Sequence, residues 1–153
     1  MHGKFDSRHP LVGLSDELIR INGRMKSLFA GARRREGLGD SEQSVLNAVV
    51  EADRPPTVPQ IGRSYGQPRQ LIQRAANSLI EAGLIEALPN PDHKRAVLLR
   101  ATPQGVAVKR EIDSEVDAIA STLSRGLNDM VIRLATAQLR TIRKQLEDEL
   151  REA

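Results

Sequence analysis

The spacing of apolar residues along the chain predicts a mainly helical protein with six helices and one β-hairpin. From Leu14 to Leu28 the apolar positions follow steps of three and four, which places them on one face of a helix. Ser15 is the candidate N-cap of this helix, and Gly37-Leu38-Gly39 ends it. Residues 1–13 carry no such pattern, and we expect a flexible N-terminal segment there.

Two shorter helices are predicted next, each with an N-terminal signal. Asp40 opens the second helix with Gln43 three residues later, which approximates a capping box, and Pro55-Pro56 ends it. Thr57 starts the third helix and again has a glutamine, Gln60, three residues later. The inward-facing side chains of both helices are expected to be Val45, Leu46, Val49, Val50, Val58 and Ile61.

The fourth predicted helix, 68–82, separates an apolar face from a polar one. In the turn before it, Gly66 can take a positive φ and Pro68 suits the first helical position, and Gly83 closes the helix. Its apolar face consists of Leu71, Ile72, Ala75, Ala76, Leu79 and Ile80. Its polar face consists of Arg69, Gln70, Gln73, Arg74 and Asn77.

A hairpin and two long helices complete the chain. Strands are predicted at Leu84–Leu88 and Val97–Arg100, on either side of the turn-rich tip Pro89–Arg95. Thr102-Pro103 is a helix start, a cap followed by proline at the first helical position. The last two helices carry apolar stripes over Val108–Leu123 and Val131–Leu150, with a break near Gly126-Leu127-Asn128.

Composition narrows the class of protein. The chain has 153 residues, no cysteine, and only Phe5, Phe29 and Tyr65 as aromatic side chains. A chain of this length has room for one ordinary domain. Because it lacks cysteine, it cannot form a disulfide framework, a thiolate metal site or a cysteine nucleophile. Residues 1–10 show no signal-peptide pattern, and no apolar run approaches the roughly 20 residues that span a bilayer. We therefore expect a cytoplasmic protein with no membrane partner.

Charge is distributed unevenly, although the formal net charge is only +3. Residues 57–101 hold six Lys or Arg and three Asp or Glu, whereas residues 40–56 hold one and four. Residues 102–153 hold eight and nine, which is typical of solvated helix faces. The basic middle of the chain is therefore the part that calls for an acidic partner.

A short helix, a turn, a polar-faced helix and a basic-tipped hairpin, in this order, predict a winged helix-turn-helix that binds double-stranded DNA. A helix fits the major groove, where Arg pairs with guanine and Gln with adenine. The candidate base-contacting residues are Arg69, Gln70, Gln73 and Arg74. Lys94 and Arg95 at the hairpin tip are candidates for the DNA backbone or an adjacent minor groove. Either feature alone is more often a solvated surface, and their combination favours DNA.

Four segments of the chain resemble the MarR family of bacterial regulators. Leu38–Leu46 is similar to the start of the family's second helix, and Leu79–Ile85 to the end of its recognition helix and its first wing strand. Asn90–Ala96 resembles the wing tip, and Leu99–Gly105 the second wing strand with the start of the fifth helix. Because these segments occur in the same order and spacing as in the family, the resemblance covers about residues 14–150.

The resemblance implies a homodimer joined by its first, fifth and sixth helices and bound to a pseudo-palindromic operator. Residues 14–36 and 102–153 would then be dimerisation helices, and 37–101 the winged helix-turn-helix lobe. Arg69, Gln70, Gln73 and Arg74 match recognition-helix positions, and Arg95 matches the wing-tip arginine. Family members often bind small aromatic or phenolic molecules between the dimer helices and this lobe. The implied function is a repressor released by a small-molecule effector, which no residue here identifies.

Two positions depart from the family pattern. Gly39 stands where the family often has a threonine cap, and Asp40 is expected to take that role. His93 stands where an aspartate often supports the wing arginine, and Asp92 is the candidate to replace it.

Other interpretations have less support. The main alternative is a helical dimeric protein-interaction module whose winged helix binds another protein, and it predicts weak DNA binding whatever sequence is offered. No nucleophile–base pattern or glycine-rich phosphate loop supports an enzyme. His2, His9 and His93 are scattered and no cysteine assists them, so neither a metal site nor a cofactor is expected. Arg33-Arg34-Arg35 are candidates for contact with DNA phosphates, and a solvated helix end explains them at least as well. The carboxylates of Glu147-Asp148-Glu149 are expected to be solvated.

Overall fold

The computed structural model describes residues 8–152, apart from the side chains of residues 33–36, 124 and 152. Residues 1–7 of the expected flexible segment, and the side chains of Arg33-Arg34-Arg35, therefore lie outside the described residues. The helices are α1 (Pro10–Glu36), α2 (Asp40–Glu51), α3 (Val58–Tyr65), α4 (Arg69–Glu81), α5 (Pro103–Thr122) and α6 (Asp129–Glu152). The strands are β1 (Ile85–Leu88) and β2 (Leu98–Ala101), and a 3₁₀ turn at Ser124–Gly126 separates α5 from α6.

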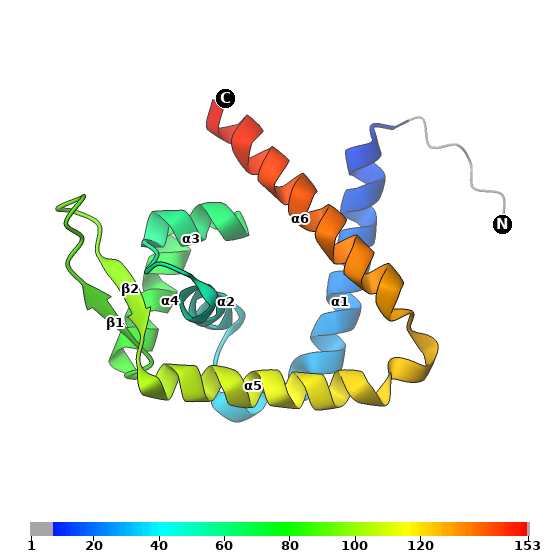
Figure 1. Ribbon diagram of the computed structural model, residues 1–153, viewed down its shortest axis with the longest axis horizontal. Coiled ribbons are helices and arrows are strands. Elements are labelled where there is room, and N and C mark those ends of the chain that lie inside the picture. The colour runs from blue at the N-terminus through cyan, green and yellow to red at the C-terminus, as the bar shows by residue number, and fades with distance from the viewer. Residues whose placement is uncertain (1–7, 153) are drawn as a thin grey trace.

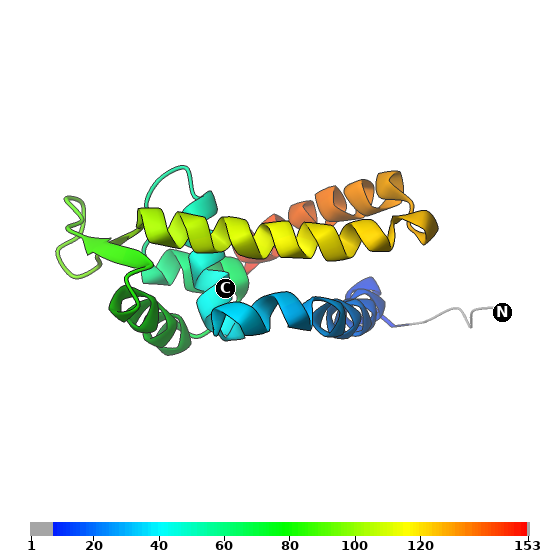
Figure 2. The same cartoon turned by 90° about the horizontal axis from the view of Figure 1, so that it is seen from below.

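The elements form a lobe at one end of α5 and a pair of long helices at the other (Figure 1). Helices α2, α3 and α4 and the β1–β2 hairpin make up the lobe, and the hairpin tip projects away from the rest of the molecule. Figure 2 shows the C-terminal part of α1 beside α5, which agrees with the contacts between these two helices, and Figure 1 shows the rest of α1 rising away from α5. We refer to α1, α5 and α6 as the long helices. The lobe is joined to them at the end of α1 and at the start of α5.

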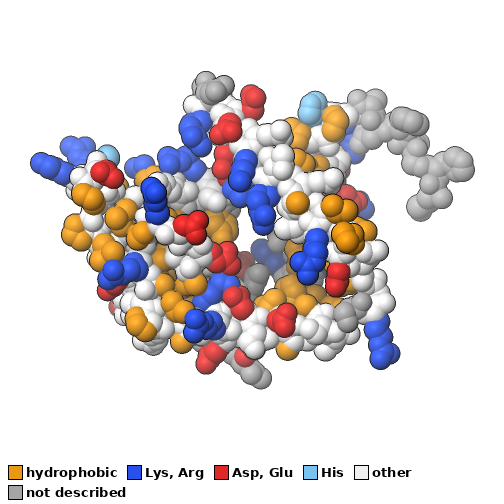
Figure 3. All heavy atoms as spheres, in the orientation of Figure 1, with side chains coloured by type: hydrophobic (Ala, Val, Ile, Leu, Met, Phe, Trp, Pro, Cys, Tyr) orange, Lys and Arg blue, Asp and Glu red, His pale blue; other side chains and the backbone are white. Residues whose placement is uncertain are grey.

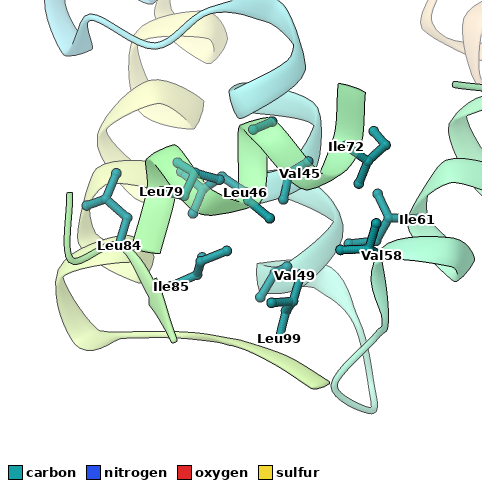
Figure 4. Close-up of a cluster of buried hydrophobic side chains, with 12 residues drawn as sticks. Val45, Leu46, Val49, Val58, Ile61, Ile72, Leu79, Leu84, Ile85 and Leu99 are labelled. Carbon is teal, nitrogen blue, oxygen red and sulfur yellow. The ribbon is translucent and has the colours of Figure 1, made fainter. Parts of the chain in front are cut away.

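The hydrophobic core lies inside the lobe (Figure 4). Leu46 of α2, Ile61 of α3 and Leu79 of α4 are fully buried there, and the hairpin adds Ile85 and Leu99. Burial of side chains of this size stabilises a fold by about 1.5–3 kcal/mol each. The predicted inward faces of the second, third and fourth helices are confirmed, with three exceptions. Ile80 is 38% exposed, Leu71 is only half-buried, and half-buried Val50 packs at the margin of this core.

Three of the predicted helix signals are confirmed. Thr57 and Gln60 form a full capping box at the start of α3, with Thr57 N–H donating to Gln60 Oε1 across 2.9 Å. Gly66 has φ 61°, a left-handed conformation that lets the chain turn sharply between α3 and α4. The hydroxyl oxygen of Thr102 caps α5 by accepting from Gly105 N–H.

Two predicted caps are wrong. Helix α1 begins at Pro10, where His9 Nδ1 accepts from Leu11 N–H, so Ser15 lies inside the helix. The prediction began the apolar stripe at Leu14 and left out Leu11, which continues the same face one turn earlier. Helix α2 has Gly39 as its N-cap, without a side-chain bond. Asp40 is its first helical residue instead.

The hairpin is confirmed, with β1 beginning one residue later than predicted and both ends of β2 lying one residue later. The strands pair antiparallel, with Ile85 opposite Ala101 and Leu88 opposite Leu98. Leu99 N–H donates to the carbonyl of Pro56, which ties β2 to the loop before α3. Where α5 begins, Gly105 packs so closely on Leu84, the residue before β1, that an added Cβ would lie 1.9 Å from the carbonyl oxygen of Leu84.

Helix α6 packs little against the rest of its own chain. Among its side chains from 129 to 151, only Ile142 and Glu147 are half-buried, and the rest are exposed. Its exposed apolar residues include Met130, Ile132 and Leu134. In the part of the chain that the structure describes, no helix has the length and hydropathy needed to cross a membrane.

Candidate nucleic-acid interface

The outer face of α4 is polar along its whole length. Arg69, Gln70, Gln73 and Arg74 are all exposed, as the sequence predicts. Gln73 Nε2 donates to Asn77 Oδ1 across 2.9 Å, which orients the glutamine side chain along the helix surface. The opposite face of α4 is anchored in the core by Ile72, Ala76 and Leu79. The helix therefore presents a rigidly supported row of hydrogen-bonding side chains.

A groove of about 570 Å³ separates α4 from the hairpin. Its charged lining residues are Arg63 of α3, Arg69 of α4 and Arg95 of the hairpin tip. No aspartate or glutamate is among its described lining residues, which gives the groove a positive potential. The side chains of Gln60, Gln73 and His93 add further hydrogen-bonding groups to the groove.

The hairpin tip is held by hydrogen bonds of its own. Asn90 Oδ1 accepts from Asp92 N–H across 3.0 Å, and His93 Nδ1 accepts from Arg95 N–H across 3.2 Å. The imidazole thus supports the wing arginine through its backbone. Asp92, the expected substitute, is bonded here through its backbone N–H, and within the described part of the chain its carboxylate forms no ion pair with Arg95. Figure 3 shows Lys and Arg side chains at this end of the molecule, at the left of the view, and others spread over the rest of the same face.

The groove gathers three of the six predicted site residues. Arg69, Gln73 and Arg95 line it, whereas Gln70, Arg74 and Lys94 are exposed outside its lining. Arg100 is another basic residue of the hairpin, but its guanidinium is already paired with Glu86 across the strands (Nε to Oε1, 2.8 Å). It is therefore less able than Arg95 to bind an anionic ligand.

Two further groove residues, Gln60 and Arg63 of α3, were not predicted from the sequence. Gln60 was interpreted only as a capping partner. The available signal was helical spacing: with Val58 and Ile61 directed inward, Gln60 and Arg63 fall on the opposite face. What could not be inferred is that this face turns toward the hairpin.

A second hollow, a cavity of about 640 Å³, lies between the lobe and the long helices. It is lined from α1, α2, α3 and α5, and by Gln67 and Ile72 near the start of α4. Apolar walls come from Phe29, Ile72, Ile112 and Val116. We refer to this space as the inter-helix cavity.

Several polar groups of the inter-helix cavity are already bonded to one another. Lys26 Nζ lies 3.3 Å from Asp40 Oδ2, which explains why Asp40 is drawn toward α1. Lys109 is buried, with 7% of its surface exposed, and its ammonium pairs with Asp113 one turn later. Asn47 Nδ2 donates to the phenol oxygen of Tyr65 across 3.0 Å.

Comparison with known proteins agrees with this architecture. The sequence model of the MarR family matches residues 36–96. An uncharacterized protein of Mycobacterium tuberculosis is 32% identical over 134 residues, which cover 83% of this chain and 92% of that protein. The chain belongs to the MarR family. The resemblance noted in the sequence is therefore confirmed.

Solved MarR family structures share the fold. NadR in complex with 4-hydroxyphenylacetate matches with a TM-score of 0.78 and 19% identity, covering 94% of this chain and 99% of that chain. A mutant of MarR from E. coli complexed with operator DNA matches with a TM-score of 0.69 and 19% identity, covering 86% and 94%. The predicted winged helix fold, with six helices and a two-stranded hairpin, is thus confirmed.

Proposed function

We propose that this MarR family protein is a transcription regulator that binds double-stranded DNA in a sequence-specific way. The observation that carries the proposal is the groove between α4 and the hairpin, which holds Arg63, Arg69 and Arg95 and no acidic side chain among its described lining. Phosphate groups are the ligands that such a groove favours. A structure of MarR itself with operator DNA adds family support.

The residues of this interface have different proposed roles. Arg69, Gln70, Gln73 and Arg74 contact base edges from the exposed face of α4, because Arg and Gln can form paired hydrogen bonds with guanine and adenine. Lys94 contacts phosphates from the hairpin tip. Arg95 reaches the backbone or the minor groove, and Arg63 of α3 contributes a further phosphate contact beside it.

A homodimer is the proposed active form. The exposed apolar side chains of α1 and α6, such as Ile19, Met130 and Leu134, support it, since soluble monomers rarely expose so much contiguous apolar surface. A two-fold dimer places two copies of α4 on a pseudo-palindromic operator. Residues 14–36 and 102–153 then serve dimerisation, and residues 37–101 serve DNA binding.

We propose that the regulatory ligand binds in the inter-helix cavity. We also propose that the protein acts in the cytoplasm, where bacterial DNA is accessible to it. Because the cavity touches both α5 and the lobe, a molecule bound in it changes how the lobe is held. NadR was solved with 4-hydroxyphenylacetate, which supports small-molecule control in this family. The expected action is that of a repressor released from DNA by its ligand.

Selection of bound fragments from the source genome tests the proposal. The purified protein is mixed with sheared genomic DNA, bound fragments are sequenced, and the enriched sites are titrated as short duplexes. We expect a small set of related, two-fold symmetric sites with affinity at least about 10³-fold above that for scrambled DNA. Equal, weak binding to every duplex would instead support the alternative, a dimeric module whose winged helix binds another protein.

A further inference from the structure

The inter-helix cavity is electrically balanced by its own side chains. It is lined by two ammonium groups, of Lys26 and Lys109, and by two carboxylates, of Asp40 and Asp113. Each ammonium is paired with one of these carboxylates, Lys26 with Asp40 and Lys109 with Asp113. Glu51 adds a further negative charge 3.9 Å from the Lys109 ammonium. The cavity therefore offers no cation that lacks a counter-ion among the described residues.

One polar atom in the cavity wall has no hydrogen-bond partner. Gln43, in the first turns of α2, lines the cavity, and its Oε1 atom is buried without accepting a hydrogen bond. An acceptor in this condition costs free energy, because it has lost water and gained nothing in return. The same carboxamide also carries an NH₂ donor, so a neutral group with both a donor and an acceptor is its natural complement.

We propose that the inter-helix cavity binds an uncharged ligand whose amide or hydroxyl group hydrogen-bonds to Gln43, and that it discriminates against carboxylates. The proposal rests on the proposed function insofar as the ligand is taken to regulate DNA binding. The apolar walls formed by Phe29, Ile112 and Val116 hold the body of the ligand. The bond to Gln43 satisfies the orphaned acceptor and fixes the orientation of the ligand.

Exclusion of a carboxylate follows from the paired charges. A carboxylate that enters must lose its water and must lie near Asp40 or Asp113. It gains an ammonium only by displacing the carboxylate that already holds it. A neutral amide of the same shape has no charge to desolvate and displaces no carboxylate. The preference for an amide over a carboxylate is therefore set by charge rather than by size.

Benzamide and benzoate are a matched pair of probes, since they share their shape and differ in charge. Each is titrated calorimetrically into the full-length protein without DNA. We expect benzamide to bind at least about fivefold more tightly than benzoate. Gln43→Leu removes the hydrogen bond to the amide and should weaken benzamide binding, so the benzamide advantage becomes smaller. Gln104→Leu, at an exposed glutamine of α5 outside the cavity, should leave both affinities unchanged. Benzoate binding as tightly as benzamide, or no heat from benzamide up to its solubility limit, overturns the proposal.

Asp113→Asn provides a second test, because it leaves the Lys109 ammonium without its closest counter-ion. We expect the preference to shift toward benzoate by about fivefold or more in this variant. Asp117→Asn removes a carboxylate one turn later on α5, outside the cavity, and should leave the preference unchanged. An unchanged preference in Asp113→Asn contradicts the role given to charge balance. Because these titrations contain no DNA, their failure is distinct from a failure to bind an operator.

Discussion

The side-chain amide of Asn47 donates a hydrogen bond to the phenol oxygen of Tyr65 across 3.0 Å, and so α2 holds the last residue of α3. Gly66 and the turn into α4 follow directly. Asn47 also donates to Glu51 Oε2 across 3.4 Å, and Oε1 of that carboxylate lies 3.9 Å from Lys109 Nζ on α5. A series of polar contacts therefore runs from the long helix α5 to the turn that precedes α4.

A double-mutant cycle on Asn47 and Tyr65 measures the first contact of this series. Asn47→Ala and Tyr65→Phe each remove one partner, and we expect a coupling free energy of about 0.5–1.5 kcal/mol in urea unfolding. Ser44→Ala is the matched control, because Ser44 is one turn earlier on α2 and its hydroxyl donates to the carbonyl of Asp40 within the helix. Its effect should add to that of Tyr65→Phe. Additivity in the Asn47 cycle as well would remove this contact from the description of the lobe.

Gly105 lets the start of α5 lie directly against the residue that precedes β1. A Cβ at this position would lie 1.9 Å from the carbonyl oxygen of Leu84, which also accepts from Thr102 N–H. Because backbone must shift to make room, Gly105→Ala should lower the free energy of unfolding by about 1–3 kcal/mol or more. Gly23→Ala, in the open middle of α1, should raise it by about 0.5–1 kcal/mol. Equal effects of the two substitutions in urea unfolding would refute the close contact.

The proposed homodimer predicts a specific mass for the protein in solution. Sedimentation at micromolar concentration should give about twice the chain mass of 16.9 kDa. Leu134→Glu places a charge in the exposed apolar stripe of α6 and should shift the equilibrium toward monomer. Ala82→Glu adds the same charge at the exposed end of α4 and should leave the mass unchanged. A wild-type monomer would exclude the two-fold arrangement on DNA.

Features set by neighbouring residues in the chain could be predicted from the sequence. The capping box of Thr57, the turn at Gly66 and the cap-and-proline start at Thr102 all depend on side chains within three residues of the bonds they form. The polar face of α4 is equally local, since it follows from helical spacing alone. These features, with the order of the elements, were enough to predict the winged helix fold.

Features that depend on packing between elements could not be predicted. Asp40 was expected to cap α2, but it is the first helical residue and pairs with Lys26 of α1. Arg63 was overlooked because only the folded lobe brings α3 beside the hairpin tip. The paired charges and the orphaned Gln43 of the inter-helix cavity likewise arise where side chains of α1, α2 and α5 meet.

The most direct test of DNA reading by α4 is a set of titrations on cognate and scrambled duplexes at several salt concentrations. Gln73→Ala and Arg69→Ala should each cost about 1–3 kcal/mol on the cognate site and much less on scrambled DNA, because base-edge contacts carry the sequence information. Lys94→Ala is the matched control at the hairpin tip. It should weaken binding to every sequence alike and reduce the salt slope by about one, as expected for the loss of one phosphate contact. If the Gln73 and Arg69 variants retain full discrimination between the duplexes, α4 does not read the operator.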